Sequence, residues 1–174
     1  MKEPQEYRKE TDFSKDLSNF LDWKTIMYQK GLDMSSIIET THQTRRNNGI
    51  PDIKVEIKSP IKMKWRYLTN PFFIECKMDN IEVLYWLNQI LRYKYKPGSE
   101  NQCRMEKYGD YHVVVSTPNW LEDNIWRNIP TNENNWLSNF FLVRVLWHLG
   151  IGVLVKERGI MKIYFNEHEV LEIE

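Results

Sequence analysis

This sequence of 174 residues is poor in cysteine and has no excess of charge of either sign. Two cysteines, Cys76 and Cys103, cannot form a disulfide framework or a zinc site made of four cysteines. One disulfide between them stays open, although free thiols in a reducing compartment are the better interpretation. The 24 Lys and Arg residues balance 24 Asp and Glu residues, so the net charge does not attract nucleic acid to the whole molecule.

Long apolar runs are missing as well. No window approaches 18 uninterrupted apolar residues, and the first ten residues, MKEPQEYRKE, contain no apolar signal region. These absences predict a soluble, intracellular protein in the cytoplasm of its host cell, with no membrane partner. No internal repeat or low-complexity tract divides the chain, so we expect a single domain over residues 1–174, with residues 1–10 flexible.

The basic residues are concentrated in one stretch of the chain. From Arg45 to Arg66 there are seven Lys and Arg residues but only two acids, Asp52 and Glu56. The candidate nucleic-acid contacts in this stretch are Arg45, Arg46, Lys62, Lys64 and Arg66. The alternative interpretation is that these cations only keep one edge of the molecule soluble.

Hydrophobic periodicity predicts an alternation of helices and strands. A first helix should begin at residue 11 or 12 and end at Gly31, followed by a short turn at 33–38 and a polar loop at 41–49. Strands are expected at 52–58, 72–78 and 111–116, with an edge strand near 62–68. Helices are expected at 81–95 and 133–149, and a hairpin at 152–165. This order favours an α/β fold in which helices cover both faces of a mixed sheet.

Two of the predicted strands carry side chains suited to phosphodiester hydrolysis. Asp52 opens one strand, and Glu75 and Lys77 share one face of a second strand 23 residues later. If the strands pair as an antiparallel hairpin, the two carboxylates can converge on one Mg²⁺ ion, which prefers oxygen ligands. Lys77 could then orient the attacking water or neutralise phosphate charge. Glu56 and Lys58 form a second E-x-K, but on the same strand as Asp52 they leave no room for the hairpin.

Three motifs occur in the order Gly49-Ile-Pro-Asp52, Glu75-Cys76-Lys77 and Gln89-Ile-Leu-Arg-Tyr93. Together they resemble the PD-(D/E)xK nuclease superfamily, and its RecB-like branch in particular, because that branch carries a Q-x-x-x-Y motif. The resemblance covers roughly residues 35–116. It implies a restriction-endonuclease-like α/β core, with a mixed central sheet flanked by helices, extended here by a C-terminal helix and a β-hairpin.

The same resemblance implies a role for each matching residue. Asp52 and Glu75 would bind the metal, together with the backbone carbonyl of Cys76, and Lys77 would assist the nucleophile. Gln89 and Tyr93, one helical turn apart, would contact the substrate or the lysine. A further metal ligand upstream stays open between His42 and Glu39. No iron–sulfur cluster is expected, because two cysteines cannot hold one.

The sequence therefore predicts a metal-dependent deoxyribonuclease that uses Mg²⁺ or Mn²⁺ and has DNA as its partner. Exonuclease or endonuclease action, DNA or RNA specificity, and assembly into a homodimer all stay open. The alternative is a catalytically inactive nucleic-acid-binding module of the same fold. A third interpretation is a protein-interaction domain that docks through exposed aromatic residues.

Overall fold

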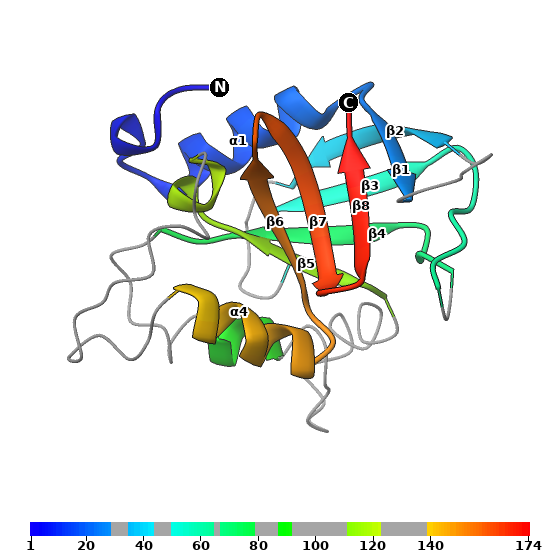
Figure 1. Cartoon of the computed structure of the whole chain (residues 1–174). Helices are drawn as coiled ribbons and strands as arrows, with labels where there is room; N and C mark the ends of the chain where they lie inside the picture. The colour runs from blue at the N-terminus through cyan, green and yellow to red at the C-terminus, as the bar shows by residue number, and fades with distance from the viewer. Residues whose placement is uncertain (29–34, 44–49, 65–66, 79–86, 92–110, 123–138) are drawn as a thin grey trace, which may run out of the picture.

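The computed structural model describes residues 1–28, 35–43, 50–64, 67–78, 87–91, 111–122 and 139–174. Eight strands form one sheet that closes on itself as a barrel, in the order in which they occur along the chain (Figure 1). They are β1 (Thr25–Tyr28), β2 (Ser35–His42), β3 (Ile53–Ile57), β4 (Phe72–Cys76), β5 (Val113–Ser116), β6 (Gly152–Glu157), β7 (Ile160–Asn166) and β8 (Glu169–Ile173). The helical elements are η1 (Pro4–Glu6), α1 (Glu10–Leu21), η3 (Pro118–Leu121), α4 (Asn139–His148) and a helical segment at 87–91.

The closed barrel shows that the predicted fold class was wrong. A restriction-endonuclease-like core has an open mixed sheet flanked by helices, whereas here β1 pairs with β2 on one side and with β8 on the other. The sheet does contain both kinds of pairing: β4–β5 and β5–β6 are parallel, and the remaining neighbours are antiparallel. In an open sheet, the two edge strands leave backbone N–H and C=O groups without a strand partner. Closure of the barrel pairs these groups with a neighbouring strand.

The N-terminal third of the chain departs most from the predicted elements. The first helix ends at Leu21, ten residues before Gly31, which itself lies outside the described residues. Trp23 adopts a left-handed backbone conformation (φ 64°) directly after the helix, and the chain then continues into β1. The predicted turn at 33–38 and the start of the predicted loop form β2 instead. Residues 1–10, expected to be flexible, include η1 and a buried Tyr7 whose hydroxyl donates a hydrogen bond to Asp16.

Several other elements are confirmed with small changes in their bounds. The strands expected at 52–58, 72–78 and 111–116 are β3, β4 and β5, and the expected hairpin is β6–β7, which turns through Arg158 (φ 52°) and Gly159 (φ 81°). The expected edge strand near 62–68 is reduced to an isolated bridge between Lys62 and Tyr67. The helices expected at 81–95 and 133–149 are described only at 87–91 and 139–148. β8 was not predicted.

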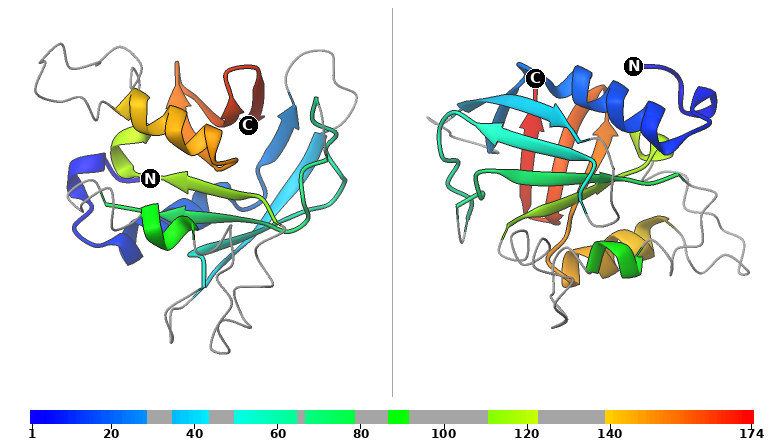
Figure 2. Two further views of the ribbon diagram at one scale, coloured as in Figure 1. Left: turned by 90° about the horizontal axis from the view of Figure 1, so that it is seen from below. Right: turned by 180° about the vertical axis from the view of Figure 1, so that it is seen from behind.

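Two groups of buried apolar side chains hold the barrel and its helices together. The larger group joins the interior faces of the strands to α1, through residues such as Phe13, Leu17 and Leu21. The smaller group packs α4 and the 87–91 segment against the outward side chains of β5 and β6, for example Val113, Val115 and Val153. Figure 2 shows α4 and α1 on different sides of the barrel. Within the described residues, no helix is long and apolar enough to span a membrane.

Candidate metal centre

The pairing of β3 with β4 brings two of the predicted site residues together. The strands are antiparallel with Ile53 opposite Ile74, so the next position outward sets Asp52 opposite Glu75. Opposed residues in an antiparallel pair point to the same face of the sheet, and Lys77 follows Glu75 by one full strand period. The predicted hairpin arrangement is therefore confirmed, and both carboxylates are buried: Asp52 is 4% exposed and Glu75 is 0% exposed.

A third carboxylate, which the sequence did not reveal, joins these two. Glu10 is the first residue of α1, and one carboxylate oxygen from each of Glu10, Asp52 and Glu75 lies within 4.8 Å of the other two. An acidic residue in the first turn of a helix is common, because it interacts favourably with the helix dipole. Glu10 therefore looked ordinary in the sequence, and only the docking of α1 against the barrel places it at the site.

Lys77 lies between two of these carboxylates. Its Nζ is 2.6 Å from Glu75 Oε1 and 3.3 Å from Glu10 Oε2, and its side chain is only 2% exposed. The backbone N–H of Lys77 donates to the Ser116 carbonyl (2.9 Å), which extends the β4–β5 pairing by one residue and holds the lysine in place. A buried lysine is costly unless it is paired, so its position depends on the carboxylates around it.

Asp52 is oriented by the strand that carries the other ligand. Its Oδ2 accepts a hydrogen bond from the backbone N–H of Cys76 (2.8 Å), which fixes one carboxylate oxygen. The Cys76 side chain is a free, buried thiol in the barrel interior. Burial, and then the negative charges of Asp52 and Glu75, raise the pKa of this thiol, so it is inert as a nucleophile. A role for the Cys76 backbone carbonyl as a metal ligand stays a prediction.

The charges at this site fit a divalent cation. Three carboxylates and one ammonium give these four side chains a formal charge of −2, confined to a small and mostly buried volume. Carboxylates this close together repel one another in a low-dielectric environment, and a cation of charge +2 relieves that repulsion. Carboxylate oxygens are also the ligands that Mg²⁺ and Mn²⁺ prefer.

The two candidates for the upstream ligand lie elsewhere. His42 pairs with Ile53, so it points to the opposite face of the sheet from Asp52, and its Nε2 is 2.9 Å from the Ser14 hydroxyl. Glu39 pairs with Glu56, near the other end of β3, and forms an exposed ion pair with Lys58 (3.1 Å). Neither residue belongs to the cluster of three carboxylates, whose third member is Glu10.

The remaining predicted site residues are only partly described. Gln89 lies half-buried in the 87–91 segment, and Lys62 and Lys64 are exposed near the end of β3. Tyr93, Arg45, Arg46 and Arg66 lie outside the described residues, as does Gly49 of the first motif. Their proposed contacts with DNA stay predictions.

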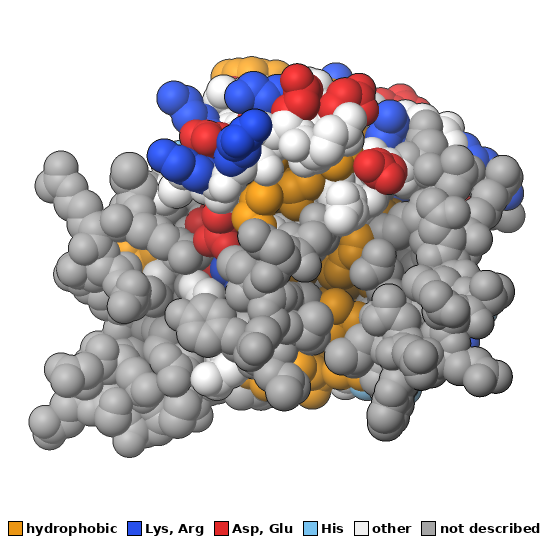
Figure 3. Space-filling view, turned by 90° about the vertical axis from the view of Figure 1, so that its left-hand side faces the viewer, with side chains coloured by type: hydrophobic (Ala, Val, Ile, Leu, Met, Phe, Trp, Pro, Cys, Tyr) orange, Lys and Arg blue, Asp and Glu red, His pale blue; other side chains and the backbone are white. Residues whose placement is uncertain are grey.

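The cluster of three carboxylates lies where the start of α1, the start of β3 and the end of β4 meet, at the left of Figure 1. Figure 3 views the molecule from this side: acidic and basic side chains gather on the upper part of the face, and hydrophobic side chains reach the surface below them.

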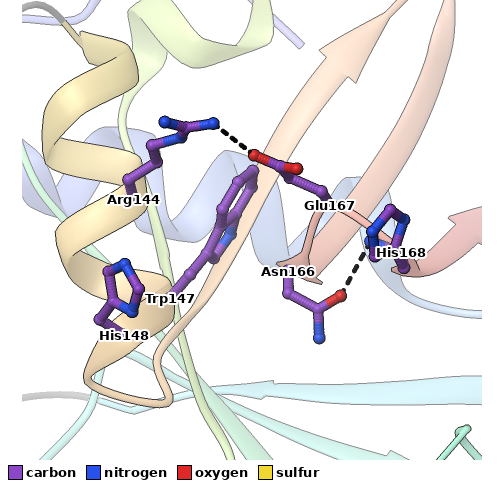
Figure 4. A pocket seen from close by; sticks show the side chains of 6 residues that line it. All are labelled: Arg144, Trp147, His148, Asn166, Glu167 and His168. Carbon is purple, nitrogen blue, oxygen red and sulfur yellow. Dashed lines mark hydrogen bonds and ion pairs between the residues drawn. The ribbon is translucent and has the colours of Figure 1, made fainter.

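A separate pocket lies between α4 and the turn that joins β7 to β8 (Figure 4). Its volume is about 410 Å³, and its lining residues are Arg144, Trp147, His148, Asn166, Glu167 and His168. Because β7 runs antiparallel to β6, and β6 is parallel to β4, this turn lies at the opposite end of the sheet from Glu75. An exposed ion pair between Arg144 and Glu167 (2.7 Å) spans its rim. None of the predicted site residues that the structure describes lines it.

The chain was compared with known proteins at three levels. No family model, no curated protein and no solved structure matches it. The function of this chain is therefore inferred from the chemistry of its own side chains.

Proposed function

We propose that this protein is a metal-dependent nuclease that hydrolyses the phosphodiester bonds of DNA. The observation that supports this proposal best is the cluster of Glu10, Asp52 and Glu75, with carboxylate oxygens within 4.8 Å of one another and the ammonium of Lys77 against two of them. Three carboxylates beside a buried lysine form an unusual combination for a protein interior, where charges are costly without a purpose.

The donor set fits Mg²⁺ or Mn²⁺, held by Glu10, Asp52 and Glu75. Such an ion, when bound, supplies Lewis-acid stabilisation of phosphoryl oxygens and lowers the pKa of an attacking water. The backbone N–H of Cys76 donates to Asp52 Oδ2 (2.8 Å) and so restrains the orientation of this carboxylate. Orientation of a ligand by its neighbours is a common requirement of a working metal site.

Lys77 supplies positive charge where the reaction develops negative charge. Its Nζ lies 2.6 Å from Glu75 and 3.3 Å from Glu10, and its side chain is only 2% exposed to solvent. A fixed ammonium can orient the attacking water by a hydrogen bond and can neutralise a phosphate oxygen in the transition state. Its burial strengthens both effects, because the electrostatic interaction is less screened than at the surface.

The order of the motifs gives independent support. The sequence Asp52, then Glu75-Cys76-Lys77, has the spacing and order found in the PD-(D/E)xK nuclease superfamily. The closed barrel differs from the fold of that superfamily, so this support concerns the site alone. The Q-x-x-x-Y motif contributes less, because Tyr93 lies outside the described residues.

A cleavage assay tests the proposal. Linear and circular DNA, both single-stranded and double-stranded, is incubated with Mg²⁺ or Mn²⁺ and with wild-type, Asp52→Ala or Glu75→Ala protein, and an RNA of the same sequence is included. We expect cleavage by the wild-type protein and none by either variant. Glu56→Ala is the matched control, since Glu56 is an exposed carboxylate on β3 whose ion pair with Lys54 (2.8 Å) lies outside the cluster. Unchanged turnover in Asp52→Ala would remove the proposal, and DNA binding without metal-dependent cleavage would favour the inactive module.

A further inference from the structure

Four polar residues recur at every fourth position along one face of α1. They are Glu10, Ser14, Ser18 and Asp22, the last of which follows the helix directly. Residues four apart lie above one another on a helix, so these side chains form a single stripe. Ser14 and Ser18 are buried, which means that the stripe faces the barrel and not the solvent.

Three members of the stripe are tied to β2. A hydrogen bond joins Ser14 Oγ to His42 Nε2 (2.9 Å). The Thr40 hydroxyl donates to the Ser18 carbonyl (2.8 Å), and the Thr40 backbone N–H donates to Asp22 Oδ1 (2.9 Å). The fourth member of the stripe is Glu10, which belongs to the cluster of three carboxylates. The contacts of the stripe therefore fix the position of α1 along β2.

The bond between Ser14 and His42 is the tie nearest to the cluster. Each residue of a helix advances about 1.5 Å, so Ser14 lies about 6 Å from Glu10 along the axis, whereas Ser18 lies about 12 Å away. The residue after His42 holds the other side of the site: the Gln43 backbone N–H donates to the Asp52 carbonyl (2.8 Å). Two consecutive residues of the β2 end thus contact the two elements that carry Glu10 and Asp52.

We propose that His42 is a positioning residue for the metal site, acting through Ser14 to hold Glu10 at the correct distance from Asp52 and Glu75. His42 is not itself a ligand, since it points to the other face of the sheet from Asp52 and its Nε2 is engaged by Ser14. This inference rests on the proposed metal site. The sequence analysis gave His42 as a candidate metal ligand, whereas here it holds the proposed ligand Glu10 in position.

The test is the affinity of the protein for Mn²⁺ alone, measured by titration calorimetry in the absence of nucleic acid. His42→Ala and Ser14→Ala should each lower this affinity by roughly 10-fold or more, the loss typical of removing a residue that orients a metal ligand. In a Glu10→Ala background, His42→Ala should cause no further loss, because its effect passes through Glu10. His42→Gln should recover most of the affinity, since its amide can still bond to Ser14.

Thr40→Val is the matched control. It removes a hydrogen bond between β2 and α1 about 12 Å from Glu10 along the helix axis, so it should lower stability while changing Mn²⁺ affinity little. Three results would overturn the inference: an equal loss in Thr40→Val, wild-type affinity in Ser14→Ala, or additive losses in the double variant of His42 and Glu10, which would make His42 a ligand. A wild-type protein that binds no Mn²⁺ would instead remove the proposed function, and this inference with it.

Discussion

Lys77 is the most deeply buried lysine among the residues that the structure describes, and its two carboxylate partners belong to different elements. Breaking a buried ion pair by removing one partner is strongly destabilising, because the other charge remains in a poorly solvating environment. The lysine therefore contributes both to the stability of the metal-free protein and to the proposed reaction. The contribution to stability is measured without metal, and the contribution to the reaction is measured as the cleavage rate with metal present.

Lys77→Met keeps the length of the side chain and removes its charge. We expect the free energy of unfolding without metal to fall by about 3–5 kcal/mol, the cost typical of a broken buried pair. Saturating Mn²⁺ should reduce this deficit, because the ion stabilises the native state that binds it. The cleavage rate should fall by roughly 10²-fold or more even with metal bound. Denaturant titrations with and without Mn²⁺ measure the first two effects.

Lys162→Met provides the matched comparison. Lys162 also lies between two carboxylates, Glu157 and Glu172, at 3.3 Å from each, but its side chain is 13% exposed where that of Lys77 is 2% exposed. Its loss should cost clearly less stability than the loss of Lys77, and Mn²⁺ should not change the difference. Equal costs at the two positions would contradict the role assigned to the burial of Lys77.

Trp23 is a second residue whose energetics are unusual. It occupies the position after a helix where glycine is normally found, with φ 64° and 64% of its surface exposed. A left-handed conformation costs a bulky residue roughly 1–2 kcal/mol. The cation–π contact between its ring and the ammonium of Lys58 (4.8 Å) stabilises the native state by about 0.5–1 kcal/mol at an exposed site. Trp23 therefore makes little net contribution to the free energy of unfolding.

Trp23→Gly should leave the free energy of unfolding unchanged or raise it by up to ~1 kcal/mol, because glycine adopts this conformation without strain. Trp23→Val should instead lower it, because a β-branched residue tolerates the left-handed region poorly. Thermal and denaturant unfolding of both variants give the comparison. A loss of stability in Trp23→Gly as large as in Trp23→Val would show that the indole ring packs more favourably than its exposure indicates.

At the scale of the elements, β3 shows why a strand could be predicted and β2 shows why one could not. In β3 the apolar residues Ile53, Val55 and Ile57 are buried and the charged residues between them are more exposed. This alternation is the pattern by which a half-buried strand is predicted from sequence. β2 contains two adjacent isoleucines, of which Ile38 is buried and Ile37 is exposed. Adjacent apolar residues fit a helix as well as a strand, and only the barrel decides which one turns inward.

Some residues of the candidate site could likewise be predicted from the sequence, and others could not. Asp52, Glu75 and Lys77 could be predicted because strand periodicity and one antiparallel pairing suffice to place them together. Glu10 could not, because its position depends on how α1 docks across β2, a contact between segments distant in sequence. His42 was one of two candidates for a metal ligand, but no local pattern shows that this histidine contacts Ser14 and not the cluster of three carboxylates.

The β6–β7 hairpin gives a pH-dependent prediction. Burial, and then the hydrogen bond from the Tyr164 hydroxyl to Glu157 Oε2 (2.5 Å), raise the pKa of Tyr164 above its ordinary value of 10.0. A raised pKa stabilises the native state below pH 10, and this contribution is lost as the pH rises further. Tyr164→Phe should therefore lose less stability than the wild type between about pH 9 and pH 11.

Thermal unfolding across that pH range measures the effect. Burial and the contact with Asp16 raise the pKa of Tyr7 as well, and burial raises that of Cys76, so the wild type should keep weakening with pH for three reasons. Only the difference between the two curves reports on Tyr164. Parallel curves for the wild type and Tyr164→Phe would show that the pKa of Tyr164 is not raised in solution.

At the scale of the whole molecule, closure of the barrel depends on one short strand. Ile26 is fully buried in the middle of β1, opposite Ser36 of β2 and Ile173 of β8. Next to it, Thr25 and Glu174 exchange two backbone hydrogen bonds, of 3.0 Å and 2.9 Å. The joint between the first and last strands therefore combines apolar packing with a regular antiparallel ladder.

Ile26→Ala should weaken this joint on both sides. We expect a loss of about 2–5 kcal/mol in the free energy of unfolding, as for other large-to-small changes in a packed core. Native-state hydrogen exchange should show faster exchange in β1, β2 and β8 together, and at Thr25 and Glu174 in particular. Val115→Ala, a buried change on β5 in the second apolar group, is the control and should not single out these strands. Acceleration confined to β1 would mean that the barrel is open in solution.

The three proposed metal ligands have a further consequence, for the order of events during folding. Glu10, Asp52 and Glu75 come from three separate segments, and Glu10 reaches the others only after α1 has docked on β2. Each of these encounters closes a long loop, whose entropic cost must be met before the ligands can meet. A partly folded chain therefore offers a metal ion at most two of its three ligands. An ion bound at the proposed site would therefore act by slowing the unfolding of the folded barrel and not by speeding its formation.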